Sequence, residues 1–409
     1  MKKSENIANP DCKGSCSKPL GEATKAIHVP YARRDAYDAL SMPVYNAVAF
    51  EFDNAAAMTE AFSGRSGAPD YSRTGNPTVT NLEDRVRILT GAKDVTAFNS
   101  GMAAISNALL ALTAHGKNVV TSKHLFGNTY SLLTESLARF GVETRLADLT
   151  DAEATSALID ENTACVYFEI ITNPQMEVAD IQQLANAVHQ KGSILMADTT
   201  TIPFTQFSSH DMGVDIEVVS STKYISGGAT SLGGLVIDYG TVEGFEQRIR
   251  GEQLFNFGAY MTPQVAYLQT IGLETLDARY RVQSSNALEL ATRLQKLPQI
   301  KHVNYVGLPD NPYHKLAQHQ FGKTAGAMVC IDLDSEKSCF QFIDSLKLIH
   351  RATNLFDNRT LAIHPYSTIF VAFSAEQKAK MDVLNTTVRL SVGLEDVDDI
   401  YNDIKQALT

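Results

Sequence analysis

The stretch SSTKYISGGATSLGGLVID, residues 220–238, places Lys223 directly behind hydroxyl residues and just ahead of a glycine-rich run. Residues 220–223 match S-x-x-K, the motif of acyl-enzyme serines, but that class also needs S-D-N and K-T-G partners. The chain has KTAG at 323–326 and no S-D-N. A phosphate-binding P-loop is excluded as well, because no glycine run ends in Gly-Lys. The role of Lys223 therefore depends on what the rest of the chain places around it.

The segments before Lys223 alternate between strand-like and helix-like patterns. The apolar runs KDVTAFNS, NVVTSK, ACVYFEI, SILMADTT and DIEVVSS predict strands, and GMAAISNALLALTAHG, YSLLTESLARFG and DIQQLANAVHQKG predict helices between them. Such alternation predicts an α/β unit with a mainly parallel sheet and helices on both faces. Ligands bind in these sheets beyond the carboxyl ends of the strands.

The pattern changes after about residue 260. Residues 262–297 predict a long helical stretch that connects to a second unit, in which AGAMVCIDL and TVRLSVGL predict strands and DVDDIYNDIKQAL a helix. We therefore expect an N-terminal arm over 1–70, partly disordered at its start, an α/β domain over 71–260, and a smaller C-terminal α+β domain over 261–409.

Composition excludes several classes of partner. The chain has 409 residues, 44% of them apolar, and a formal charge of −11, which argues against nucleic acid. No apolar run is long enough to span a membrane, and the N-terminus lacks the apolar core of a secretory signal. Five scattered cysteines indicate a reduced, cytoplasmic protein. Cys12 and Cys16 could form half a metal site, but nothing completes it, so no metal is expected.

Four features of the first domain point to one cofactor. Ser100 and Gly101 open a helix after a strand, which suits a phosphate group. Asp198 closes an apolar strand, where a carboxylate can keep a pyridine nitrogen protonated. Phe126 offers a flat ring for stacking, and Lys223 follows another strand. Each has an ordinary structural explanation alone, as a cap, a turn, a core residue or a surface charge. Together, in one α/β segment, they predict a site for pyridoxal 5'-phosphate (PLP).

Six motifs carry a resemblance over residues 25–409: YSRTGNPT (71–78), SGMAAI (100–105), TNP (172–174), SSTKY (220–224), LAIHP (361–365) and RLSVGLED (389–396). The chain resembles the Cys/Met metabolism family of PLP enzymes, the trans-sulfuration family, and within it the O-acetylhomoserine sulfhydrylase branch. The resemblance implies a large PLP-binding domain of the aspartate-aminotransferase type, known as fold type I, with a smaller C-terminal domain.

The resemblance also implies a role for each matching residue. Lys223 binds the cofactor covalently and then carries protons, and Tyr71 is a second group for proton transfer. Arg389 clamps the substrate α-carboxylate with its planar guanidinium, beside Asn354. Tyr71 and Arg73 match a pair that reaches the phosphate site of a neighbouring subunit, so shared active sites within a dimer, and a tetramer of dimers, are implied. The other implied cofactor-binding residues are Ser100, Gly101, Met102, Phe126, Glu169, Asn173, Asp198, Thr200, Ser220 and Thr222.

Four positions depart from the family pattern. Phe126 stands where most members have tyrosine, so this side chain can stack but cannot donate a proton. Gly228 replaces a histidine, Phe356 replaces the usual glycine of NLFDNRTLAIHP, and Thr199 replaces asparagine. The segment GGATSLGG is nearer to the sulfhydrylase form than to the lyase form. These differences favour substrates that carry their own good leaving group.

The resulting functional hypothesis is γ-replacement on an O-acylated homoserine by sulfide or a thiol, giving homocysteine or methionine. The alternative is elimination of the type catalysed by methionine γ-lyase or by cystathionine γ- and β-lyases. A third possibility is a PLP-binding protein without efficient γ-chemistry. The sequence leaves open the acetyl or succinyl group, and sulfide or a thiol as nucleophile.

Overall fold

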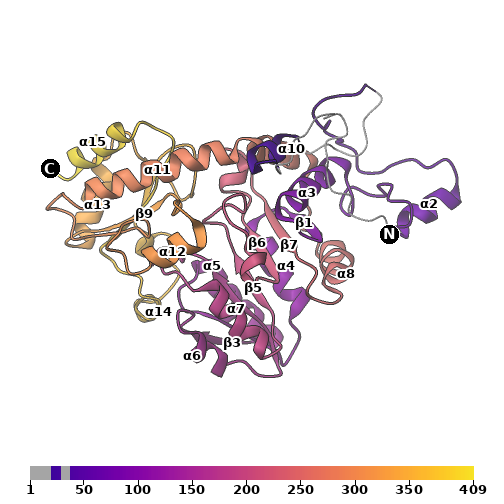
Figure 1. Cartoon of the computed structure of the whole chain (residues 1–409), viewed down its shortest axis with the longest axis horizontal. Coiled ribbons are helices and arrows are strands. Elements are labelled where there is room, and N and C mark those ends of the chain that lie inside the picture. The colour runs from indigo at the N-terminus through magenta and orange to yellow at the C-terminus, as the bar shows by residue number, and fades with distance from the viewer. Residues whose placement is uncertain (1–19, 29–36) are drawn as a thin grey trace.

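The structure is a computed structural model that describes residues 20–28 and 37–409 (Figure 1). Cys12, Cys16 and the start of the expected N-terminal arm lie outside the described residues. Two sheets organise the chain, joined by long helices.

The larger sheet has seven strands in the order β1-β7-β6-β5-β4-β2-β3. Only β7 runs antiparallel to its neighbours, so the expected mainly parallel sheet is confirmed. Apart from the edge strand β3, which is partly exposed, the strands are almost wholly buried, as strands covered by helices on both faces must be. They are β1 (Asp94–Phe98), β2 (Asn118–Ser122), β3 (Glu143–Ala147), β4 (Thr163–Glu169), β5 (Leu195–Asp198), β6 (Ile216–Val219) and β7 (Gly234–Asp238).

Helices cover both faces of this sheet. Helix α4 (Gly101–Leu112) packs on β6 and β7, and its apolar residues share a core with Met196 of β5 and Val218 of β6. On the other face, Ala197 and Val219 pack in a core that includes α3 (Pro77–Thr90) and α7 (Ile181–Gln190). Because side chains alternate along a strand, Asp198 points to the α4 face, as Met196 does.

The remaining helices before residue 260 are short. The segment YSLLTESLARFG is helical as expected, but irregular: α5 (Gly127–Ser131) continues as a π-helical turn over Leu132–Ser136 and a 3₁₀ turn over Leu137–Phe140. The others are α1 (Glu22–His28), α2 (Ala55–Phe62), α6 (Ala152–Ala157), 3₁₀ turns over His210–Met212 and Tyr224–Ser226, α8 (Phe245–Arg248), a π-helical turn over Ile249–Leu254 and α9 (Phe255–Phe257).

The expected connector is two helices rather than one. Helix α10 (Pro263–Glu274) ends at Thr275, whose backbone leaves the helical region, and α11 (Leu276–Leu294) follows at once. A five-stranded sheet in the order β10-β11-β12-β9-β8 then forms the second unit. Its strands and helices are β8 (His302–Asn304), α12 (His314–Phe321), β9 (Met328–Asp332), α13 (Glu336–Ser345), β10 (His350–Arg351), β11 (Leu361–Ile363), α14 (Ala375–Lys380), β12 (Thr387–Ser391) and α15 (Val397–Ala407).

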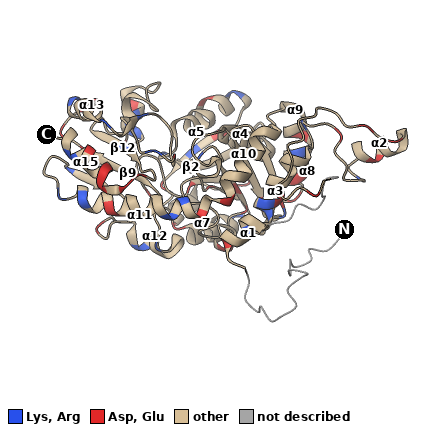
Figure 2. Cartoon of the chain, turned by 90° about the horizontal axis from the view of Figure 1, so that it is seen from above, with Lys and Arg blue, Asp and Glu red and all other residues tan. Residues whose placement is uncertain are grey.

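Helix α1 packs against α3, α10 and α11, whereas the segment that carries α2 extends from the body. Helix α2 lies at the tip of this extension in both views (Figures 1 and 2). Acidic and basic residues are interspersed along the chain (Figure 2). Within residues 20–28 and 37–409, no helix combines the length and apolar character needed to cross a membrane, and no group of His, Cys, Asp and Glu is arranged to hold a metal. The domain boundaries expected at residues 70 and 260 remain predictions. All strands of the larger sheet lie inside them, between Asp94 and Asp238.

Candidate active site

Lys223 lies just beyond the carboxyl end of β6. The chain turns there through a hydrogen bond from the Lys223 amide to Ser220 O (3.1 Å). The ammonium Nζ donates to Asn354 Oδ1 of the second unit (2.9 Å). Burial, with repulsion from Arg389, lowers the pKa of Lys223 to about 8, although the Asp198 charge opposes this. Roughly one lysine in ten is therefore neutral at pH 7, which a nucleophilic amine needs.

A cavity of about 570 Å³, here called the inner cavity, opens around Lys223 between the two sheets. Ser100 caps α4, with its side chain accepting from Ala103 N (3.1 Å). A Cβ at Gly101 would lie 2.6 Å from Ser220 Cβ and Oγ, so only glycine lets the Ser220 hydroxyl lie against this helix start. Free N–H groups, the helix dipole and a hydroxyl thus converge, as a phosphate group requires.

The hydroxyls of Thr200 and Thr222 are already engaged within the protein. Thr200 Oγ1 accepts from Ser220 N (2.8 Å), and the Thr200 hydroxyl also hydrogen-bonds Asp198, so it connects that carboxylate to the backbone at Ser220. Thr222 Oγ1 donates to Gly233 O (3.1 Å) and accepts from Gly233 N (3.0 Å). This reciprocal pair connects residues 220–228, here called the lysine loop, to the rest of the glycine-rich run that follows.

Two carboxylates face the inner cavity in different surroundings. Asp198 accepts from Thr200 N (2.9 Å) and from the Tyr167 hydroxyl (3.4 Å). Glu169, 8% exposed, accepts from Phe126 N (2.6 Å). Burial and then the Asp198 charge raise the pKa of Glu169 to about 8. Burial raises the pKa of Asp198 as well, but hydrogen bonds from Thr200 and Tyr167 and the Lys223 charge oppose that rise, so of the two carboxyl groups Asp198 has the environment that better stabilises the ionised form.

Arg389 on β12 closes the cavity from the second unit. It is 2% exposed, and its Nη1 donates to Asn173 Oδ1 (3.0 Å) and its Nη2 to Asn354 O (3.3 Å). Burial lowers its pKa to about 10, so it stays charged at neutral pH. Its buried Nε has no partner within the described chain. A free N–H on a buried guanidinium fits a carboxylate ligand.

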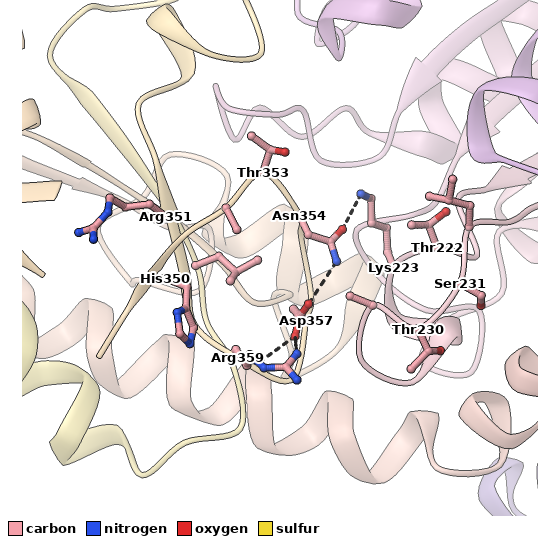
Figure 3. A pocket seen from close by; sticks show the side chains of 14 residues that line it. Thr222, Lys223, Thr230, Ser231, His350, Arg351, Thr353, Asn354, Asp357 and Arg359 are labelled. Carbon is pink, nitrogen blue, oxygen red and sulfur yellow. Dashed lines mark hydrogen bonds and ion pairs between the residues drawn. The ribbon is translucent and has the colours of Figure 1, made fainter. Parts of the chain in front are cut away.

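Most predicted site residues come together here. The inner cavity is lined by Ser100, Gly101, Met102, Phe126, Glu169, Asn173, Asp198, Thr200, Ser220, Thr222, Lys223 and Arg389. Asn354 lies at its edge, in an outer cleft of about 1070 Å³ that shares Lys223 with it (Figure 3). These roles remain predictions, but the residues form the phosphate cradle, carboxylate and lysine that PLP needs.

Tyr71 and Arg73 are not brought to this cavity. Tyr71 is 40% exposed on the N-terminal extension, with the Arg73 guanidinium carbon 5.6 Å from its ring centre. Arg73 also donates to Phe255 O. Neither lines the inner cavity of its own chain, so their predicted roles would require a neighbouring subunit.

The sequence missed the apolar and hydroxyl lining, and it missed Tyr167. The missed lining residues are Ile105, Ile171, Thr201, Leu232, Thr353, Leu355, Thr368 and Ile369. In sequence these residues look like core or surface positions, because no spacing rule marks a cavity wall. Thr199 proves structural, since its hydroxyl donates to the buried Glu217 (2.5 Å).

Comparison with known proteins agrees with this geometry. The family model for Cys/Met metabolism PLP-dependent enzymes matches residues 23–409. The chain belongs to this family. It is therefore a PLP-dependent enzyme of fold type I, as the resemblance implied.

Similar members of the family catalyse more than one reaction. A putative O-acetylhomoserine (thiol)-lyase structure from Campylobacter jejuni, with a pyridoxyl-lysine group, is 31% identical with a TM-score of 0.92 and covers 95% of this chain and 100% of its own. An O-acetylhomoserine sulfhydrylase structure from Wolinella succinogenes is 40% identical, with a TM-score of 0.73. The match covers 82% of this chain and 98% of the Wolinella chain. The L-methionine gamma-lyase of Pseudomonas putida is 35% identical, and the match covers 96% of this chain and 98% of the lyase.

Proposed function

We propose that this enzyme replaces the γ-substituent of an O-acylated homoserine with sulfide or a thiol. One observation carries the choice: no tyrosine, histidine or cysteine side chain of the described chain lines the inner cavity, and Phe126 lines it where most family members have tyrosine. A carboxylate leaves without prior protonation, whereas a thiolate is far more basic and needs an acid. Beside Lys223 and Glu169, the wall therefore offers no phenol, imidazole or thiol as a dedicated acid for the leaving group, which suits an O-acyl substrate.

The side chains divide the work between two ends of the cavity. Arg389 holds the substrate α-carboxylate with its unpaired Nε, and Asn354 keeps Lys223 within reach of the substrate α-carbon. Bound PLP supplies an electron sink for the carbanion formed at that carbon. Lys223 takes the α-proton as the general base, and its pKa of about 8 suits both removal and return of protons near neutral pH.

The family is commonly oligomeric, and we propose a tetramer built from dimers. Tyr71 and Arg73 would then approach the phosphate site of the neighbouring subunit, and Tyr71 would be the phenol for thiol activation. The proposal places the enzyme in the cytoplasm, which agrees with Cys165, Cys330 and Cys339 being unpaired.

Elimination is the second candidate, because the methionine γ-lyase relative is as similar overall as the sulfhydrylases. Incubation with L-methionine alone separates the two. Fast release of 2-oxobutanoate would reject γ-replacement as the main reaction, and slow release with rapid turnover of O-acetylhomoserine plus sulfide would support it. Such turnover also rules out a protein that binds PLP without γ-chemistry. A parallel assay with O-succinylhomoserine identifies the acyl group, and one with cystathionine tests elimination of the cystathionine-lyase type.

A further inference from the structure

The turn over residues 354–358 touches the lysine loop at three points. Asn354 Oδ1 accepts from Lys223 Nζ (2.9 Å), and Asn358 Nδ2 donates to Gly227 O (3.0 Å). Between them, the ring of Phe356 stacks on Tyr224, with 4.1 Å between centroids and 8° between planes. Tyr224 directly follows Lys223, so this turn grips the loop on both sides of the lysine.

Phe356 holds an unusual backbone conformation for its residue type. Its φ is 58°, in the left-handed region where glycine is preferred, and glycine is the residue that the family pattern has there. The side chain is 1% exposed. A bulky ring at such a position is retained only if its contacts outweigh the backbone cost.

The backbone of Phe356 contacts β12, the strand that carries Arg389. Its N–H donates to Ser391 Oγ (2.6 Å) on β12, two residues after Arg389. Arg389 itself donates to Asn354 O (3.3 Å). The turn is therefore fastened to the Arg389 strand on one side and to the Lys223 loop on the other.

Gly228 completes the same contact. Its φ is 125°, and a Cβ there would lie 2.3 Å from Asn358 Nδ2. The family's histidine at this position would push Asn358 away from Gly227. Phe356 and Gly228, which both depart from the family pattern, thus lie in one interface and fit one another.

We propose that Phe356 is a positioning residue that sets the distance between Lys223 and Arg389. The proposal rests on Lys223 being the cofactor lysine. The base and the carboxylate clamp lie on different sheets, and small displacements of such groups cost large factors in rate. The ring of Phe356 on Tyr224, with its backbone on β12, links the two sheets at this point.

The test compares Phe356→Leu with Phe342→Leu. Phe342 is a 2% exposed residue of α13, a helix of the second unit that packs on α15 and β12, so the same atoms are lost outside the 354–358 turn and the segment around Lys223. Phe356→Gly is the second variant if Phe356→Leu does not fold, and Tyr224→Leu removes the stack from the other side. Each holoenzyme is measured for Tm, kcat, and the apparent pKa of the absorption band of lysine-bound PLP.

We expect Phe356→Leu and Tyr224→Leu each to shift that pKa by about half a unit or more and to lower kcat about tenfold. The double variant should resemble either single one, because both remove one contact. Phe342→Leu should lower Tm and leave the band unchanged. A Phe356→Leu enzyme with reduced Tm, wild-type kcat and a wild-type band pKa overturns the inference. Lack of the band in wild type would instead overturn the assignment of Lys223.

Discussion

Arg389→Lys provides the sharpest test of the substrate site. The guanidinium donates to Asn173 Oδ1 (3.0 Å) and Asn354 O (3.3 Å), and its buried Nε has no partner within the described residues. A lysine keeps the charge but cannot hold both acceptors and a carboxylate in one plane. Loss of one charge-assisted hydrogen bond costs about 1.5–3 kcal/mol, which corresponds to about a 10- to 150-fold loss in kcat/KM.

The assay is steady-state turnover of O-acetylhomoserine with sulfide, together with spectral titration of the substrate into the holoenzyme. An analogue with hydrogen in place of the α-carboxylate serves as the internal comparison. We expect Arg389→Lys to weaken the binding of the amino acid strongly and the binding of the analogue only slightly. Arg279→Lys is the matched control, since Arg279 is also buried but donates to Gly272 O (2.6 Å) and Thr275 Oγ1 (3.1 Å). Equal losses for the two substrates would refute a carboxylate clamp at Arg389.

Three further changes test the proton chemistry and the packing. The pKa of Lys223 at about 8 predicts that PLP loading of the apoenzyme speeds up about tenfold per pH unit below 8 and then levels off; a rate independent of pH contradicts this. Burial disfavours charged His124, but Glu177 and Asp382 outweigh it and raise its pKa. The stabilisation that protonated His124 provides is therefore full below the pKa of the unfolded chain and is lost as pH rises through the raised value of the folded chain. The deficit of His124→Gln in unfolding free energy should therefore shrink with rising pH. A deficit that does not change with pH would contradict this. Phe126→Tyr should raise 2-oxobutanoate release from L-methionine about tenfold or more, because the new phenol can protonate the leaving thiolate. An unchanged rate would show that the missing phenol does not limit elimination.

The fold and half of the site were predictable because their signals are local. Alternating apolar runs predicted the parallel sheet, and the strand ends at Asp198 and Val219 predicted where the carboxylate and the lysine lie. The reversed direction of β7 was not predictable, since an apolar run has the same pattern in either direction. Neither was the break at Thr275 between α10 and α11, where the helical periodicity continues.

The sequence by itself determined which chemical groups the enzyme has: a lysine, a carboxylate, a glycine at a helix start and an arginine, each marked by a short motif. Tertiary structure alone decided what these groups do to one another. Burial lowers the pKa of Lys223 to about 8, and burial beside Asp198 raises that of Glu169 to about 8. It also gave Phe356 a role, because the ring meets Tyr224 across 132 residues of chain, from 224 to 356. Proximity between distant segments sets desolvation and charge coupling, and no local pattern encodes it.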